Sequence, residues 1–113
     1  MSAIRTFTVT VANPGAGNRY YIDGVLQDTI NLAEGYTYIF NYPLAHPFRF
    51  STTSDGTHNS GSEYTTGVTV NSSTQVEITV AASAPTLYYY CSIHSGMGGK
   101  ANTVDSDTWG MLQ

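Results

Sequence analysis

Residues 4–12 read IRTFTVTVA, and from Thr6 to Val11 polar and apolar side chains alternate one by one. In an extended chain, Phe7, Val9 and Val11 lie on one face, and the threonines between them lie on the other. A period of two is typical of a strand with one buried face and one face in water. The stretch therefore predicts a β-strand, and the same alternation recurs along most of the chain.

Turn signals separate this strand from several others. Asp23-Gly24 lies between two β-prone runs in RYYIDGVLQ, and this dipeptide favours a type I′ hairpin turn, which needs positive φ at both central residues. No stretch keeps a helical period over three turns. We therefore predict an all-β fold for residues 1–104, namely an antiparallel Greek-key β-sandwich of about seven or eight strands, with a Greek-key barrel as the alternative. The other expected strands lie in NLAEGYTYIFNY, HPFRFST, STQVEITVAA, TLYYYCS and GGKANTV.

Composition narrows the classes of function. The chain has 113 residues, which fits a single domain, and only 11% of them are charged, with a net charge of −4. The few cations are scattered, whereas nucleic-acid binding needs clustered lysine and arginine, so we expect no nucleic-acid partner. No apolar run is long enough to span a bilayer, and one cysteine cannot form an internal disulfide. The opening residues lack a signal-peptide pattern, so we expect synthesis in the cytosol without export.

A long polar stretch, residues 51–67, reads STTSDGTHNSGSEYTTG. It consists of turn-forming residues and is long for a connection in a compact domain, which favours a surface loop with a binding role. His58 lies within it, and we expect its side chain to be exposed rather than to bind a metal.

Soft donor atoms gather in residues 87–99, LYYYCSIHSGMGG. Strand parity places Cys91 on the inner face with Leu87, and it places His46 on the same face as Phe48 and Phe50. The loop after Cys91 can fold back over the same point. Two imidazoles, a thiolate and a weak thioether form the ligand set of a blue-copper site, so we predict one copper site formed by His46, Cys91, His94 and Met97.

Other interpretations of these residues are weaker. A single cysteine or methionine is often only a buried apolar residue. A catalytic cysteine–histidine pair needs a third group to orient it, and structural zinc usually takes four cysteine or histidine ligands. Asp105 and Asp107 lie in a polar segment, where we expect them to be solvated. We therefore expect the protein not to be an enzyme.

Two motifs resemble the cupredoxin family. HPFRF resembles its first-histidine strand, and YYYCSIHSGMGG resembles its terminal ligand loop. The resemblance implies a type 1 copper site with His46, Cys91 and His94 as equatorial ligands and Met97 as the axial ligand. Pro47 departs from the family, because electron-transfer members often carry an asparagine there that braces the site. The resemblance therefore leaves the surroundings of the first histidine open.

Longer segments resemble a narrower group. GNRYYIDGVLQDTINLAEGYTYIF, RFSTTSDGTHNSGSEYTTGV and a WG tail are similar to cupredoxin-like modules in structural proteins of marine phages that infect cyanobacteria. This implies a virion protein, either capsid decoration or cement or a tail module, whose partners are other virion proteins or copies of itself. The alternative is a soluble blue-copper electron carrier of the periplasm or lumen, which docks on a redox partner. Against the carrier, the sequence around His94 offers only Ile93, Met97 and glycines as an apolar patch.

The last segment, residues 105–113, is predicted to be an attachment tail. Trp109, Met111 and Leu112 follow a polar spacer, and no further strand is expected to bury them. Large apolar side chains lose free energy when they stay in water, and tryptophan is enriched at binding hot spots. We predict that these three residues bind a partner. The alternative is that Trp109 folds back and closes one end of the sandwich.

Overall fold

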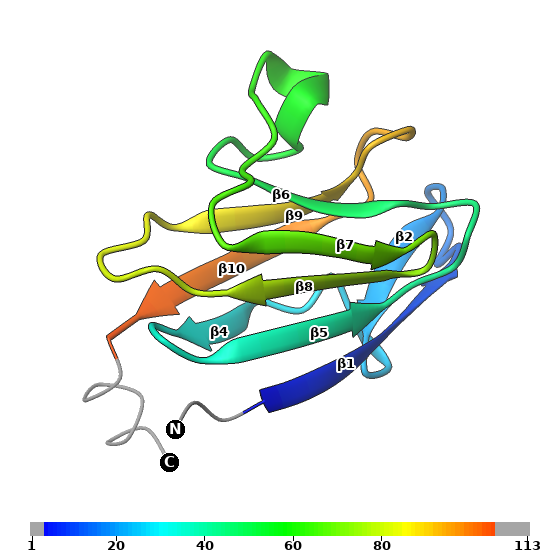
Figure 1. Cartoon of the computed structure of the whole chain (residues 1–113). Coiled ribbons are helices and arrows are strands. Elements are labelled where there is room, and N and C mark those ends of the chain that lie inside the picture. The colour runs from blue at the N-terminus through cyan, green and yellow to red at the C-terminus, as the bar shows by residue number, and fades with distance from the viewer. Residues whose placement is uncertain (1–3, 106–113) are drawn as a thin grey trace.

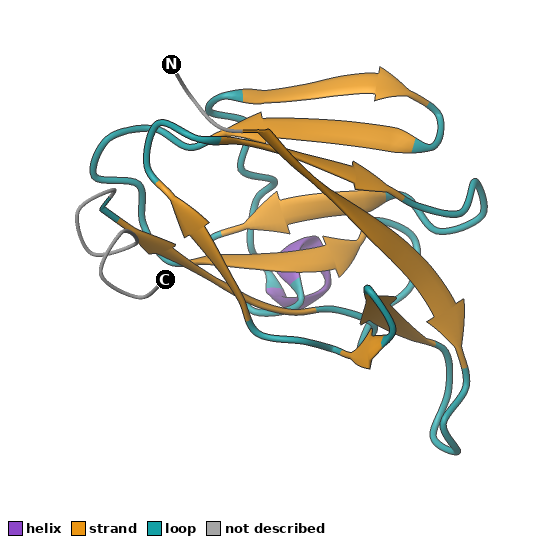
Figure 2. Ribbon diagram, turned by 90° about the horizontal axis from the view of Figure 1, so that it is seen from below, coloured by secondary structure: helices purple, strands orange, loops and turns teal. Residues whose placement is uncertain are grey.

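Two β-sheets pack face to face in the computed structural model, which describes residues 4–105 (Figures 1 and 2). One sheet has the strand order β3-β2-β1-β5-β8-β7, and the other has the order β4-β10-β9-β6. The elements are β1 (Ile4–Ala12), β2 (Arg19–Ile22), β3 (Val25–Leu26), β4 (Ile30–Ala33), β5 (Thr37–Asn41), β6 (Phe48–Ser51), the 3-10 helix η1 (Gly56–Asn59), β7 (Val68–Ser72), β8 (Gln75–Thr79), β9 (Leu87–Cys91) and β10 (Gly99–Val104). The predicted all-β sandwich is confirmed.

The alternation in β1 has the predicted consequence. Phe7 and Val9 are buried, and the threonines at positions 6, 8 and 10 are exposed. The predicted hairpin joins β2 to β3, and both of its central residues have positive φ, 48° at Asp23 and 85° at Gly24. Local sequence therefore determined both the buried face of this strand and the position of the turn.

The sheets are mixed rather than purely antiparallel. β1 pairs in parallel with β5, with Phe7 opposite Phe40, and β10 pairs in parallel with β4, with Ala101 opposite Ile30. Alternation fixes the face that a side chain takes, but it carries no information on which strand pairs with which or in which direction. The described residues form ten strands instead of seven or eight, because short strands such as β3 are separate elements.

Aromatic rings fill the space between the sheets. Phe48 is fully buried and stacks on Phe40 and Tyr89, with ring centroids 4.8 and 5.1 Å apart. In the β6–β9 register Phe48 lies opposite Cys91, so the aromatic core extends as far as the last residue of β9. Within residues 4–105, no helix is long and apolar enough to cross a membrane. Trp109, Met111 and Leu112 lie outside the described residues, so the attachment tail stays a prediction.

Candidate metal centre

Three of the predicted ligands meet at the end of β9. Cys91 is fully buried, and its Sγ lies 3.6 Å from Nδ1 of His94 and 4.0 Å from Nδ1 of His46. The two imidazole centroids are 4.9 Å apart, and the three donor atoms all lie within 4.8 Å of one another. Met97, the fourth predicted ligand, lies near them in the same loop, with its side chain 1% exposed. The sequence motif therefore describes a cluster in space.

The first histidine reaches this cluster from a turn, not from a strand. β6 begins at Phe48, so the parity rule used for His46 does not apply to it. Its amide donates to the carbonyl of Pro43 (3.0 Å), and the carbonyl of Pro47 accepts from the amide of Ser92 (3.0 Å). The first bond closes the turn that carries His46, and the second attaches the chain before β6 to the chain after β9. His46 therefore comes close to Cys91 although it precedes the strand.

The donor spacing fits a small metal ion. Metal–sulfur and metal–imidazole bonds of roughly 2.3 and 2.0 Å, at angles between tetrahedral and trigonal, place sulfur and nitrogen about 3.5–3.7 Å apart. The observed separations of 3.6 and 4.0 Å differ from this by a few tenths of an ångström at most. A thiolate with two imidazoles is also a donor set that suits copper. The residues present therefore fit a copper ion.

Electrostatics favour the ligand form of His46. Burial lowers its pKa below the usual value, and the neighbouring His94 lowers it further. A lower pKa means that the imidazole is neutral at neutral pH, and only the neutral ring can bind a metal. Its burial therefore prepares this side chain for a cation. His94 is exposed, so one imidazole of the cluster faces solvent.

Tyr20 on β2 contacts two of the ligand segments, and sequence reasoning missed it. Its hydroxyl donates to the carbonyl of His46 (2.6 Å), and its amide donates to the carbonyl of Met97 (2.9 Å). The ring is fully buried beside Phe48, at a centroid distance of 5.3 Å. Its pKa is raised, mainly by burial and then by the nearby Cys91. The signal available in the sequence was that a tyrosine on an inward-facing position needs a partner for its hydroxyl.

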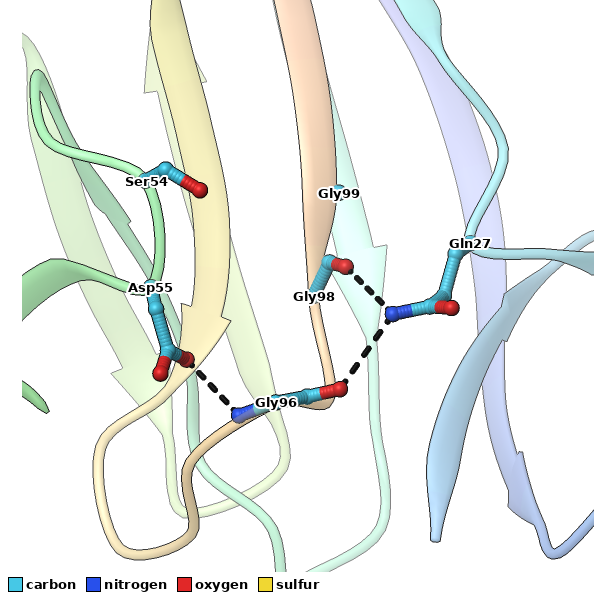
Figure 3. Close-up of a pocket in the computed structure, with 6 residues that line it drawn as sticks. All are labelled: Gln27, Ser54, Asp55, Gly96, Gly98 and Gly99. Carbon is cyan, nitrogen blue, oxygen red and sulfur yellow. Dashed lines mark hydrogen bonds between the residues drawn. The ribbon is translucent and has the colours of Figure 1, made fainter. Parts of the chain in front are cut away.

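The loop of residues 51–67 holds the ligand loop from the outside. Oδ1 of Asp55 accepts from the amide of Gly96 (2.9 Å), and from the other side Nε2 of Gln27 donates to the carbonyls of Gly98 (2.8 Å) and Gly96 (3.3 Å) (Figure 3). These bonds attach the backbone of the ligand loop to two other segments. The long polar loop therefore has a structural role at this end of the molecule.

His58 is exposed, as predicted, but it is not without a contact. Its Nε2 donates to the carbonyl of Cys91 (2.7 Å), so it bonds the backbone of the ligand rather than the sulfur. Gly56 packs against the ring of Tyr90, where a Cβ would lie 2.6 Å from ring atoms. His58 thus belongs to the support of the site, and it lies outside the group of donor atoms.

Comparison with known proteins identifies the fold. No protein-family model and no curated protein matches the sequence. Among solved structures, rusticyanin from Thiobacillus ferrooxidans has 17% sequence identity and a TM-score of 0.54, with 87% of this chain and 75% of that chain covered. Reduced rusticyanin has 16% identity and a TM-score of 0.53, with 87% and 77% covered. A third structure, described as the copper protein rusticyanin, has 17% identity and a TM-score of 0.55, with 87% and 76% covered. Rusticyanin is a cupredoxin, and this chain therefore has a cupredoxin-like fold.

Proposed function

We propose that the protein binds one copper ion through His46, Cys91 and His94, with Met97 as the axial ligand, and that it carries single electrons. The observation that carries the proposal is the assembled donor set, with all three donor atoms within 4.8 Å of one another. The cupredoxin-like fold and the copper protein rusticyanin among its structural neighbours support it. Bound copper would supply a reversible one-electron change between Cu(II) and Cu(I).

The proposed ligands differ in burial, and this difference suits them to different roles. Cys91 is fully buried, which keeps its sulfur away from water and from oxidants in solution. His94 is exposed, so its ring connects the cluster to the surface, where a partner can approach. Little reorganisation is needed, because Tyr20 and Asp55 hold the ligand segments through hydrogen bonds.

The surface around the exposed imidazole favours the carrier over a purely structural metal site. Leu44 and Ile93 are 67% and 60% exposed, and they lie two residues before His46 and one residue before His94. A contiguous exposed apolar patch can mark a contact surface. Leu44 is a further exposed apolar side chain, and His46, two residues later, has its ring 4.9 Å from that of His94. A redox partner would bring its own centre close to His94 by covering these two residues.

The virion role stays a separate hypothesis. It rests on the resemblance of the sequence to cupredoxin-like modules of marine phages, and it would make the metal site a stabilising element. Capsid or tail proteins would then be the partners, and the virion the location, instead of a redox partner in the periplasm or lumen. Electron microscopy of assembled particles tests it, because copies of this chain on a protein shell would establish the role.

The test of copper binding is a visible absorption spectrum after loading with Cu(II). We expect one equivalent of metal and an intense band from charge transfer between the Cys91 thiolate and copper. Cys91→Ser should abolish the band, whereas His58→Ala should retain it, because His58 bonds only a backbone carbonyl. Reduction and reoxidation should remove and restore the band. A colourless protein with bound copper would contradict the type 1 site and the carrier function.

A further inference from the structure

A surface hollow opens beside the exposed ligand imidazole. One wall is the segment from Ala16 to Arg19, and the other is the ligand loop from Ile93 to Met97. The hollow therefore includes His94 together with one of the chain's few cations, Arg19. Arg19 is not one of the residues that form the metal cluster.

The guanidinium of Arg19 has a fixed position. Nη1 donates to the carbonyl of Asn18 (2.9 Å), and Nη2 donates to the carbonyl of Ala16 (3.1 Å). Gly17 and Gly96 lie beside the guanidinium and have no side chains to cover it. A Cβ added at Gly17 would lie 3.1 Å from Nη1, and one added at Gly96 would lie 3.8 Å from it. A guanidinium has five N–H donors, so these two bonds leave donors for a ligand. The charge is thus oriented and accessible.

Arg19 differs from the other arginines in its charge partners. Arg5 pairs with Asp23 (3.6 Å) and Arg49 pairs with Glu63 (3.7 Å), whereas no carboxylate of residues 4–105 lies within ion-pair distance of Arg19. The chain carries a net charge of −4, so acidic groups outnumber cations. A fixed cation with no acidic partner among residues 4–105 therefore lies in a hollow that His94 also lines.

We propose that this hollow binds a carboxylate group, with Arg19 as its main contact and His94 beside it. A planar guanidinium matches a carboxylate through paired, charge-assisted hydrogen bonds. The carboxylate is either a free small molecule or an acidic side chain of a partner protein. The binding site itself does not need copper. Its effect on the metal rests on the proposed function, because an anion beside a ligand imidazole favours the more positively charged oxidised state.

The test begins with the metal-free protein, titrated with acetate at constant ionic strength and followed by backbone amide chemical shifts. We expect saturable shifts at Gly17, Ser95 and Gly96, and no such shifts with chloride at the same concentration. Arg19→Gln should weaken acetate binding about tenfold or more. Lys100→Gln removes the same charge from an exposed residue outside the hollow and should leave binding unchanged. Absence of saturation, or equal loss in both variants, would overturn the proposal.

A second arm separates the two sources of the carboxylate. A blocked Gly-Glu-Gly peptide is titrated in the same way, and tighter binding than acetate assigns the hollow to a protein side chain. Tighter binding of acetate assigns it to a free small molecule. In the copper-loaded protein, acetate should lower the reduction potential, and this shift should be absent in Arg19→Gln. The titration of the metal-free protein tests the carboxylate site independently, so its result is valid even if the protein fails to bind copper.

Discussion

Replacing Tyr20 with phenylalanine removes one hydroxyl from the interior and leaves the ring in its place. The lost hydrogen bond is the 2.6 Å contact to the carbonyl of His46, which is left without this donor in a partly buried position. A lost bond of this kind, with its carbonyl unsatisfied, costs about 1–2 kcal/mol of the free energy of unfolding. For a domain of this size that corresponds to a fall in melting temperature of about 4–10 °C.

The same change should weaken metal binding, because the turn that carries His46 loses its attachment to β2. Groups that orient metal ligands typically contribute about 10–100-fold in affinity. The measurements are urea unfolding of the metal-free protein and competition titration with Cu(II). The matched control is Tyr21→Phe, since Tyr21 is only partly buried and its hydroxyl makes no hydrogen bond within residues 4–105. Equal stability and equal copper affinity of the two variants would refute this account of Tyr20.

Three further predictions concern the rest of the molecule. Gly98→Ala would drive a Cβ into the carbonyl of Tyr89, so urea unfolding should show a loss of about 1–3 kcal/mol; unchanged unfolding would contradict this. Burial raises the pKa of four tyrosines, so the stability they contribute is complete below about pH 10 and should be lost as the pH rises further; the NMR ring signals of these four should show ionisation only on unfolding, and their ionisation in the folded protein near pH 10 would argue against it. These are Tyr20, Tyr38, Tyr89 and Tyr90. Deleting residues 105–113 should leave the melting temperature unchanged and abolish self-assembly or binding to the capsid. A large fall in melting temperature would instead place Trp109 in the core.

Features encoded by neighbouring residues could be predicted from the sequence. The alternation in β1 gave its buried face, Asp23-Gly24 gave the hairpin, and the spacing from Cys91 to His94 placed two donor atoms 3.6 Å apart. Each of these depends on backbone geometry within a few residues. Local rules are sufficient at such positions.

Features that depend on distant segments could not be predicted. The parallel partner of β1 and the contact between Tyr20 and His46 join residues that no periodicity relates. The sequence correctly predicted that His46 lies near Cys91, but the strand parity used for that prediction does not apply. His46 lies in a turn, and the hydrogen bonds at Pro43 and Pro47 bring it near Cys91. The support by Asp55 was equally invisible, because a polar loop rich in turn residues does not show which backbone amide it will bond.

The position of β10 has a consequence for the order of folding. It lies between β4 and β9, and its pairing with β4 joins Asn102 to Asn31, which are 71 positions apart. β10 is the strand next to β4 in this sheet, so β4 stays unpaired there until β10 arrives. Closing so long a segment of chain is entropically costly and slow. During synthesis, the donor residues emerge before the strand that completes their sheet. A metal ion that arrives early would therefore meet a flexible chelating peptide, and one that arrives after β10 has inserted would meet the rigid site.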